Sequence, residues 1–294
     1  MAKQDFYHYT PSLDAAIVFA VLYTLAAIGT VLQFLRYRSW VWTVMVLASG
    51  MESAGYILRT ISTQHIYDQN LYVASFSLIV LAPVLMAAAC YIVFGRIVFH
   101  VVPKEARTTR LLWIPPRFVT PIFVACDVLA LLLQLTGAVQ ITTVSSTAVN
   151  AKSKLSRGKT IAQIGVAVQL ICFGLFSIIA VRFNFTSKRF KASFEERLGS
   201  EKGEKHYTVD GKKLKPNWQA ILRVTNFASA MILIRSVYRM VDFSLGKTGY
   251  TSEHEWVMYV FDAAAIFPVV SLYIYWHPSK YLPYLGFRLP KHAR

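Results

Sequence analysis

Charged residues are scarce in this chain of 294 residues, since Asp, Glu, Lys and Arg make up only 16% of it. An ordinary soluble domain has about 25%. Cysteine is scarcer still, with three in the whole chain, and hydrophobic residues reach 55%. Cys90, Cys126 and Cys172 all fall inside apolar stretches, where we expect them to pack as small hydrophobic residues. The composition therefore argues against a soluble domain and against a disulfide-stabilised one.

Motifs for catalysis and metal binding are also missing. The sequence contains no HExxH, HxxxH or CxxC pattern, which argues against a zinc-dependent hydrolase, and no GxSxG nucleophile elbow. The fragment SRGKT at 156–160 lacks the first glycine of a phosphate-binding loop. We therefore expect no cofactor, no metal and no enzymatic activity.

What the sequence does have is long apolar runs, each long enough to cross a hydrocarbon core of about 30 Å as a helix. They predict an all-α, polytopic integral membrane protein, organised as one seven-helix domain over residues 1–294. The predicted helices cover about residues 12–35, 40–62, 72–101, 117–141, 160–186, 217–245 and 254–276. The main polar segment between them is 187–216.

The net charge of +16 is unevenly placed along the chain. Lys and Arg crowd into the connections after the first, third and fifth helices and into the tail, whereas 63–71 has neither. The positive-inside rule then places the N-terminus outside and the C-terminus and 187–216 in the cytoplasm. The basic segment 142–159 is the one exception. This distribution is a topology signal that suits anionic lipid and does not indicate nucleic-acid binding.

Full charges also occur inside the predicted helices, where each costs about 2.5–3.5 kcal/mol on insertion scales and so faces a partner or a cavity. On 40–62, Glu52, Gly55, Tyr56 and Arg59 are spaced 0, 3, 4, 7, which places them in one stripe. Three other helices carry similar stripes. The candidate substrate-binding residues are Glu52, Tyr56, Arg59, Asp127, Gln134, Arg235, Arg239, Asp242, Glu255, Tyr259 and Asp262.

With the N-terminus outside, these stripes fall between the midplane and the outer surface, which predicts a shared polar chamber in the outer half of the bundle. We expect at least two acid–base pairs within salt-bridge range. Gly55 is expected to let a neighbouring helix approach closely. The alternative is that such pairs only hold helices together, without any ligand.

Several segments together resemble the fungal RTA-like family of lipid-translocating exporters, over about residues 7–283. They include ESAGYILR (52–59), LAPVLMAAACYIVFGRI (81–97), FVACDVLALLLQLTGA (123–138), RSVYRMVDFSLG (235–246) and HPSKYL (277–282). The family more often has Glu where Asp242 stands. The resemblance implies fungal origin, seven helices, and roles in resistance to toxic amphipaths or in moving sphingoid bases and related lipids.

Three function classes remain open. The favoured one is a transporter, exporter or flippase of amphipathic lipids or lipid-like toxic compounds, such as sphingoid bases or sterol-like amines. The alternative is a seven-helix lipid-sensing receptor or regulator of membrane lipid asymmetry, and an intramembrane enzyme comes last. The expected partners are membrane lipids and an amphipathic substrate, in the plasma membrane or else an internal membrane. The oligomeric state stays open.

Overall fold

The structure is a computed structural model, and the residues it describes are 11–103, 106–107, 112–143, 151–192, 194, 196, 208–209, 212–213, 217–245 and 249–282. Part of the basic connections used in the topology argument lies outside them, including Lys104, Arg110 and most of 197–216. Seven helical segments in the described part of the chain are long and apolar enough to cross a membrane. The protein is therefore an integral membrane protein built from helices, as predicted.

The elements follow the predicted order, with one two-residue antiparallel strand pair, in which Thr208 pairs with Lys213 and Val209 with Lys212. Their bounds are α1 Leu13–Tyr37, η1 Trp40–Trp42, α2 Thr43–Gln64, α3 Gln69–Val101, α5 Pro116–Thr143, α6 Ala151–Thr186, η3 Ser187–Phe190, β1 Thr208–Val209, β2 Lys212–Lys213, α9 Trp218–Leu245, α10 Tyr250–Glu253, α11 Glu255–Met258, η5 Tyr259–Ala263, α12 Ala264–Tyr275 and η6 Pro278–Lys280.

Most helix ends lie within three residues of the prediction, and two helices differ more clearly. Helix α6 begins at Ala151 and not at 160, because residues such as Ala, Lys, Leu and Arg favour a helix even where the chain is polar. The last predicted helix, 254–276, is divided into α11, the π-helical turn η5 and α12, and the short helix α10 precedes it. The π-turn carries Tyr259 and Asp262, both buried. Single π-turns inside helices often occur at functional positions.

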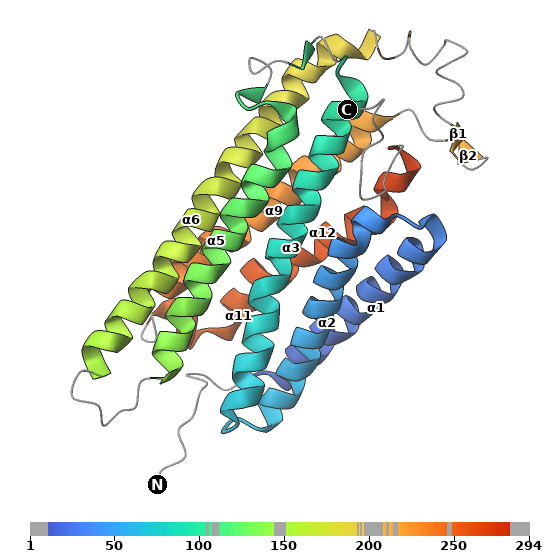
Figure 1. Cartoon of the computed structure of the whole chain (residues 1–294). Coiled ribbons are helices and arrows are strands. Elements are labelled where there is room, and N and C mark those ends of the chain that lie inside the picture. The colour runs from blue at the N-terminus through green and yellow to red at the C-terminus, as the bar shows by residue number, and fades with distance from the viewer. Residues whose placement is uncertain are drawn as a thin grey trace.

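The long helices form a ring in which each contacts the next along the chain, and α12 returns to α1 to close it. Helix α3 also contacts α9 across the ring, so these two are the most central (Figure 1). Helices α5 and α6 make the most extensive contact and lie on the opposite side of the bundle from α1 and α2 (Figure 1). The arrangement brings α2, α9 and α11–η5 toward one interior.

Side-chain burial distinguishes the packed interior of the bundle from its apolar outer surface. Tyr91, Phe94, Phe123, Phe173 and Phe176 are buried and form a network of ring contacts between α3, α5 and α6. Large apolar side chains on the outside of every long helix are instead exposed, as expected for a surface that faces lipid. The buried interior is therefore where charged residues need an explanation.

Candidate functional site

Asp262 lies at the centre of the charged interior, on the π-turn η5. Its two carboxylate oxygens form ion pairs with Arg235 and Arg239, which lie one turn apart on α9. Arg239 also lies 4.0 Å from Asp242, three residues on. Arg235, Arg239 and Asp262 are all at most 4% exposed. One carboxylate thus binds two guanidinium groups and joins η5 to α9 away from water.

A second ion pair joins α2 to α11. Arg59 Nη2 lies 2.8 Å from Glu255 Oε1, and Arg59 Nε donates a hydrogen bond of 3.3 Å to the Tyr259 hydroxyl. The backbone amide of Ser12 donates to the other oxygen of Glu255 at 2.7 Å, just before α1 begins. These contacts connect α1, α2 and the last helical segment at one level of the bundle. At least two of the predicted acid–base pairs are thereby confirmed.

Arg235 also binds a backbone carbonyl group that a proline leaves without its helical donor. Pro83 lies inside α3 and has no backbone N–H, so the carbonyl of Ile79, four residues earlier, loses its usual helical donor. Arg235 Nη2 donates to this carbonyl oxygen at 2.7 Å. A buried carbonyl without a donor is costly, and the guanidinium of α9 removes that cost. Pro83 and Arg235 are therefore linked through the Ile79 carbonyl, because the arginine replaces the donor that the proline removes.

Gly55 allows α2 and α3 to meet closely, as predicted. A Cβ atom on Gly55 would lie 2.7 Å from Ile79 Cγ1 and 3.2 Å from the Ile79 amide nitrogen. Small residues permit such approaches between membrane helices. Since Ile79 is also the residue that Arg235 binds, the close approach positions the carbonyl for the charged cluster.

We expect Gly55→Ala to destabilise the folded protein by about 1–3 kcal/mol, the usual cost of overpacking a tight contact. Gly50 is the matched control, because it lies on the same helix, is exposed, and a Cβ there would meet nothing within 4 Å. Thermal unfolding of the purified variants in detergent measures the difference. Equal midpoints for Gly55→Ala and Gly50→Ala would contradict the close-approach argument.

Glu52 differs from the other acids. It is 1% exposed, its Oε2 atom has no hydrogen-bond partner, and none of the ion pairs found among the described residues includes it. Its electrostatic neighbours are Arg235, Asp262 and Arg239. Tyr56, one turn on, also has a buried hydroxyl without a hydrogen-bond partner. This face of α2 therefore presents two unsatisfied polar groups to the charged interior.

Two predicted site residues lie apart from this cluster. Asp127 accepts a hydrogen bond of 2.9 Å from the Tyr91 hydroxyl on α3, and Gln134 donates one of 2.9 Å to Gln169 on α6. The expected convergence of four stripes is thus met by α2, α9 and the α11–η5 segment, and α5 does not contribute. The physical reason is the ring, in which α5 is packed between α3 and α6.

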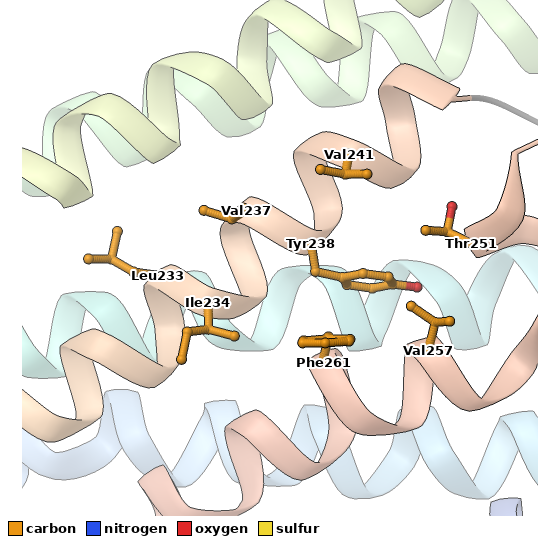
Figure 2. A pocket seen from close by; sticks show the side chains of 8 residues that line it. All are labelled: Leu233, Ile234, Val237, Tyr238, Val241, Thr251, Val257 and Phe261. Atoms are coloured by element: carbon orange, nitrogen blue, oxygen red, sulfur yellow. The ribbon is translucent and has the colours of Figure 1, made fainter.

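An apolar groove lies on the outside of the bundle, and none of the charged residues of the cluster lines it. Its volume is about 430 Å³, and it lies between α9 and the segment formed by α10, α11 and η5 (Figure 2). The rings of Tyr238 and Phe261 lie nearly parallel across it, with centroids 6.3 Å apart. Tyr238 is adjacent in sequence to Arg239, whose guanidinium lies 5.6 Å from the Tyr238 ring. The lining residues are Leu233, Ile234, Val237, Tyr238, Val241, Thr251, Val257 and Phe261.

Sequence reasoning did not find the groove or the Ile79 carbonyl. The groove residues are ordinary apolar side chains, and only packing leaves a space between them. The carbonyl had one available signal, Pro83 in the middle of an apolar run, which removes a donor at a known spacing. For metals, no cluster of His, Cys, Asp or Glu suited to hold an ion occurs within the described residues.

The fold and site define a seven-helix membrane protein in which α9 contributes to a buried ion-pair cluster and to an apolar groove on the outside of the bundle. The family model described as "RTA1 like protein" matches residues 45–284, and the chain belongs to this family. Protein RTA1 of Saccharomyces cerevisiae is 29% identical, over 93% of this chain and 86% of its own length. Protoporphyrin uptake protein 1 of the same species is 30% identical, over 90% and 89%. Sphingoid long-chain base transporter RSB1, also from S. cerevisiae, is 23% identical, over 92% and 72%. No solved structure matches the chain.

Proposed function

We propose that this protein moves amphipathic lipids between the two leaflets of a membrane. The observation that carries the proposal is the apolar groove open on the outside of the bundle, one of whose lining residues, Tyr238, lies between it and the buried cluster. The Arg239 guanidinium is 5.6 Å from the centre of the Tyr238 ring. A lipid has the same two parts in the same order, an apolar chain joined to a polar head. The groove would hold the chain and the cluster would bind the head.

Charge-assisted hydrogen bonds are the contacts that recognise the polar head group of a lipid. Carboxylates bind amino groups, and arginines bind phosphate or carboxylate groups with paired donors. The relatives named for transport of a sphingoid base and for uptake of protoporphyrin are both named for amphipathic molecules. Sphingoid bases carry an amino group, so they are the first substrates to test on this chain.

The site residues divide by their position. The cluster consists of Arg59, Arg235, Arg239, Asp242, Glu255, Tyr259 and Asp262. Glu52 and Tyr56 face it, and each has a buried oxygen atom without a hydrogen-bond partner. Glu52 lies near the middle of α2, and the others lie toward the end of the bundle where α2 and α9 end and α11 begins. The lysine and arginine distribution supports placing this end of the bundle and the N-terminus outside. We propose the plasma membrane as the location. Tags at residue 2 and at the C-terminus, probed on intact and permeabilised cells, test this orientation.

The test of function is reconstitution of the purified protein into vesicles with a fluorescent sphingoid base. We expect transbilayer movement to be faster than in protein-free vesicles, as measured by quenching of the label in the outer leaflet. Binding of the labelled lipid without faster movement would instead favour a lipid-sensing regulator. Chemical conversion of the lipid, visible by mass spectrometry, would contradict our proposal that the protein is not an enzyme.

The groove itself is tested by filling it. We expect Val237→Trp to slow movement at least severalfold, because the indole would occupy space that the lipid chain needs. Val237 is 50% exposed, and Val21 on α1, at 53%, is the matched control outside the groove. Val21→Trp should leave the rate unchanged. Equal rates in Val237→Trp and the wild type would remove the groove from the proposal.

A further inference from the structure

Two arginines stand at the same level on α5 and α6, at the end of the bundle opposite the ion-pair cluster. Arg117 immediately precedes the apolar part of α5, and Arg182 immediately follows the uncharged run 160–181 of α6. The two helices lie side by side (Figure 1), and the rings of Phe123 and Phe176 meet between them with centroids 5.6 Å apart. Each arginine is six residues further out than its own helix's ring, which is about 9 Å along the axis. Both therefore lie where the apolar surface of the bundle ends.

Each of these arginines lies against an exposed aromatic ring. The guanidinium carbon of Arg182 is 4.3 Å from the centre of the Trp113 ring, and that of Arg117 is 5.6 Å from the centre of the Phe118 ring. Both rings belong to the exposed apolar surface. Trp113 has a φ of 62°, in the left-handed region that a bulky residue rarely adopts. The backbone just before α5 thus takes an uncommon conformation, and its indole ring lies on the outside of the bundle against Arg182.

A lysine extends the same surface. Lys188, just after α6, has its ammonium nitrogen 5.8 Å from the centre of the exposed Phe185 ring. Phe185 comes three residues after Arg182, so the two share a face of the helix. Arg117 and Lys188 are exposed, and neither takes part in an ion pair within the part of the chain that the structure describes. Three cationic groups and three exposed rings therefore meet at the edge of the apolar surface.

This combination has the chemistry of a site for a lipid phosphate. Guanidinium groups present paired donors that match phosphate oxygens, and exposed aromatic rings favour the boundary between hydrocarbon and head groups. Apolar side chains continue from the rings along both helices, since Ile122 on α5 and Ile178 on α6 are exposed one turn further into the apolar part. The surface thus offers positive charge for a head group and apolar contact for the chains attached to it.

We propose that this surface of α5 and α6 binds one anionic phospholipid, with its phosphate between Arg117 and Arg182 and its acyl chains along Ile122 and Ile178. In the orientation proposed above this lipid belongs to the cytoplasmic leaflet, where anionic lipids are concentrated. The site is separate from the groove beside α9, and its existence does not depend on what the protein transports.

The test compares two lipids that share their acyl chains and their phosphate and differ in net charge. Dioleoyl phosphatidylserine or dioleoyl phosphatidylcholine is titrated into the purified protein in detergent, and bound lipid is counted by native mass spectrometry. We expect the wild type to retain one phosphatidylserine at concentrations where it retains no phosphatidylcholine. Arg117→Gln and Arg182→Gln should each weaken phosphatidylserine binding about tenfold, the usual effect of losing a hydrogen bond to a charged group.

Arg36→Gln is the matched control. Arg36 is exposed near the end of α1, at the same end of the bundle, and its guanidinium lies 5.9 Å from the Tyr37 ring. This variant loses the same charge from a similar pair of residues and should bind phosphatidylserine as the wild type does.

Equal binding of the two lipids by the wild type, or an equal loss in Arg36→Gln and Arg182→Gln, would overturn the proposal. Displacement of phosphatidylserine by inorganic phosphate at the same concentration would show a site for a free anion and contradict the assignment to a lipid. Unfolding temperatures check that the variants are folded. If Arg182→Gln does not fold, Arg117→Gln carries the test, because Arg117 is exposed and its replacement removes no buried contact.

Discussion

Asp262→Asn is expected to destabilise the protein more than any other conservative substitution in the cluster. The amide keeps the shape of the side chain but removes the negative charge that binds Arg235 and Arg239. Removing one partner of a buried ion pair costs about 3–5 kcal/mol, because the remaining charge stays buried and unpaired. Here two guanidinium groups lose their partner together, so we expect an effect at the upper end of that range.

The measurement is thermal unfolding of the purified variant in detergent, together with its abundance in membranes. Asp14→Asn provides the same chemical change at an exposed position and should unfold with the wild type. If Asp262→Asn were as stable as Asp14→Asn, the Arg235–Asp262–Arg239 arrangement would not hold α9 to η5. The cluster would then be a weak contact, and the site built on it would lose its support.

The second large effect is expected at the pair formed by Arg59 and Glu255. Arg59→Glu brings two acids together where the native contact is 2.8 Å, and Glu255→Arg brings together two bases. Each single change should lower the free energy of unfolding by about 3–5 kcal/mol, since it places two buried charges of the same sign side by side. Combining the two changes restores an acid–base pair between α2 and α11.

We expect the double variant to recover only part of the lost stability. Glu255 also accepts from the Ser12 amide, and Arg59 also donates to Tyr259, and neither bond survives the exchange of the two side chains. A double-mutant cycle on unfolding midpoints separates the pair from these extra bonds. Strictly additive losses, with no recovery in the double variant, would show that the two charges do not stabilise each other.

The helices could be predicted from the sequence because a membrane span needs a long apolar run, and this chain has one for each span. The charged stripes could be predicted for a similar reason. Charged side chains are costly in such runs, so they stand out in the sequence, and helical spacing shows which of them share a face. They are Glu52, Arg59, Arg235, Arg239, Asp242, Glu255 and Asp262. Their pairing across helices followed from the near balance of acids and bases.

Which stripe meets which depends on the order of helices around the ring, and spacing within one helix does not contain that information. Asp127 and Gln134 show this clearly, because their stripe is as regular as the others and yet faces Tyr91 and Gln169. The π-turn at 259–263 is a second example. It changes the angular position of Asp262 relative to Glu255, which an ideal helical spacing does not predict.

Pro83 and Arg235 also constrain how this sequence can change over evolutionary time. If Pro83 is replaced first, residue 83 regains an amide, the Ile79 carbonyl recovers a helical donor, and Arg235 still has Asp262. If Arg235 is replaced first, the carbonyl is left without a donor and Asp262 loses one of its two cations. Descent from this chain can therefore lose the proline before the arginine at small cost, whereas the reverse order passes through a poorly folding intermediate.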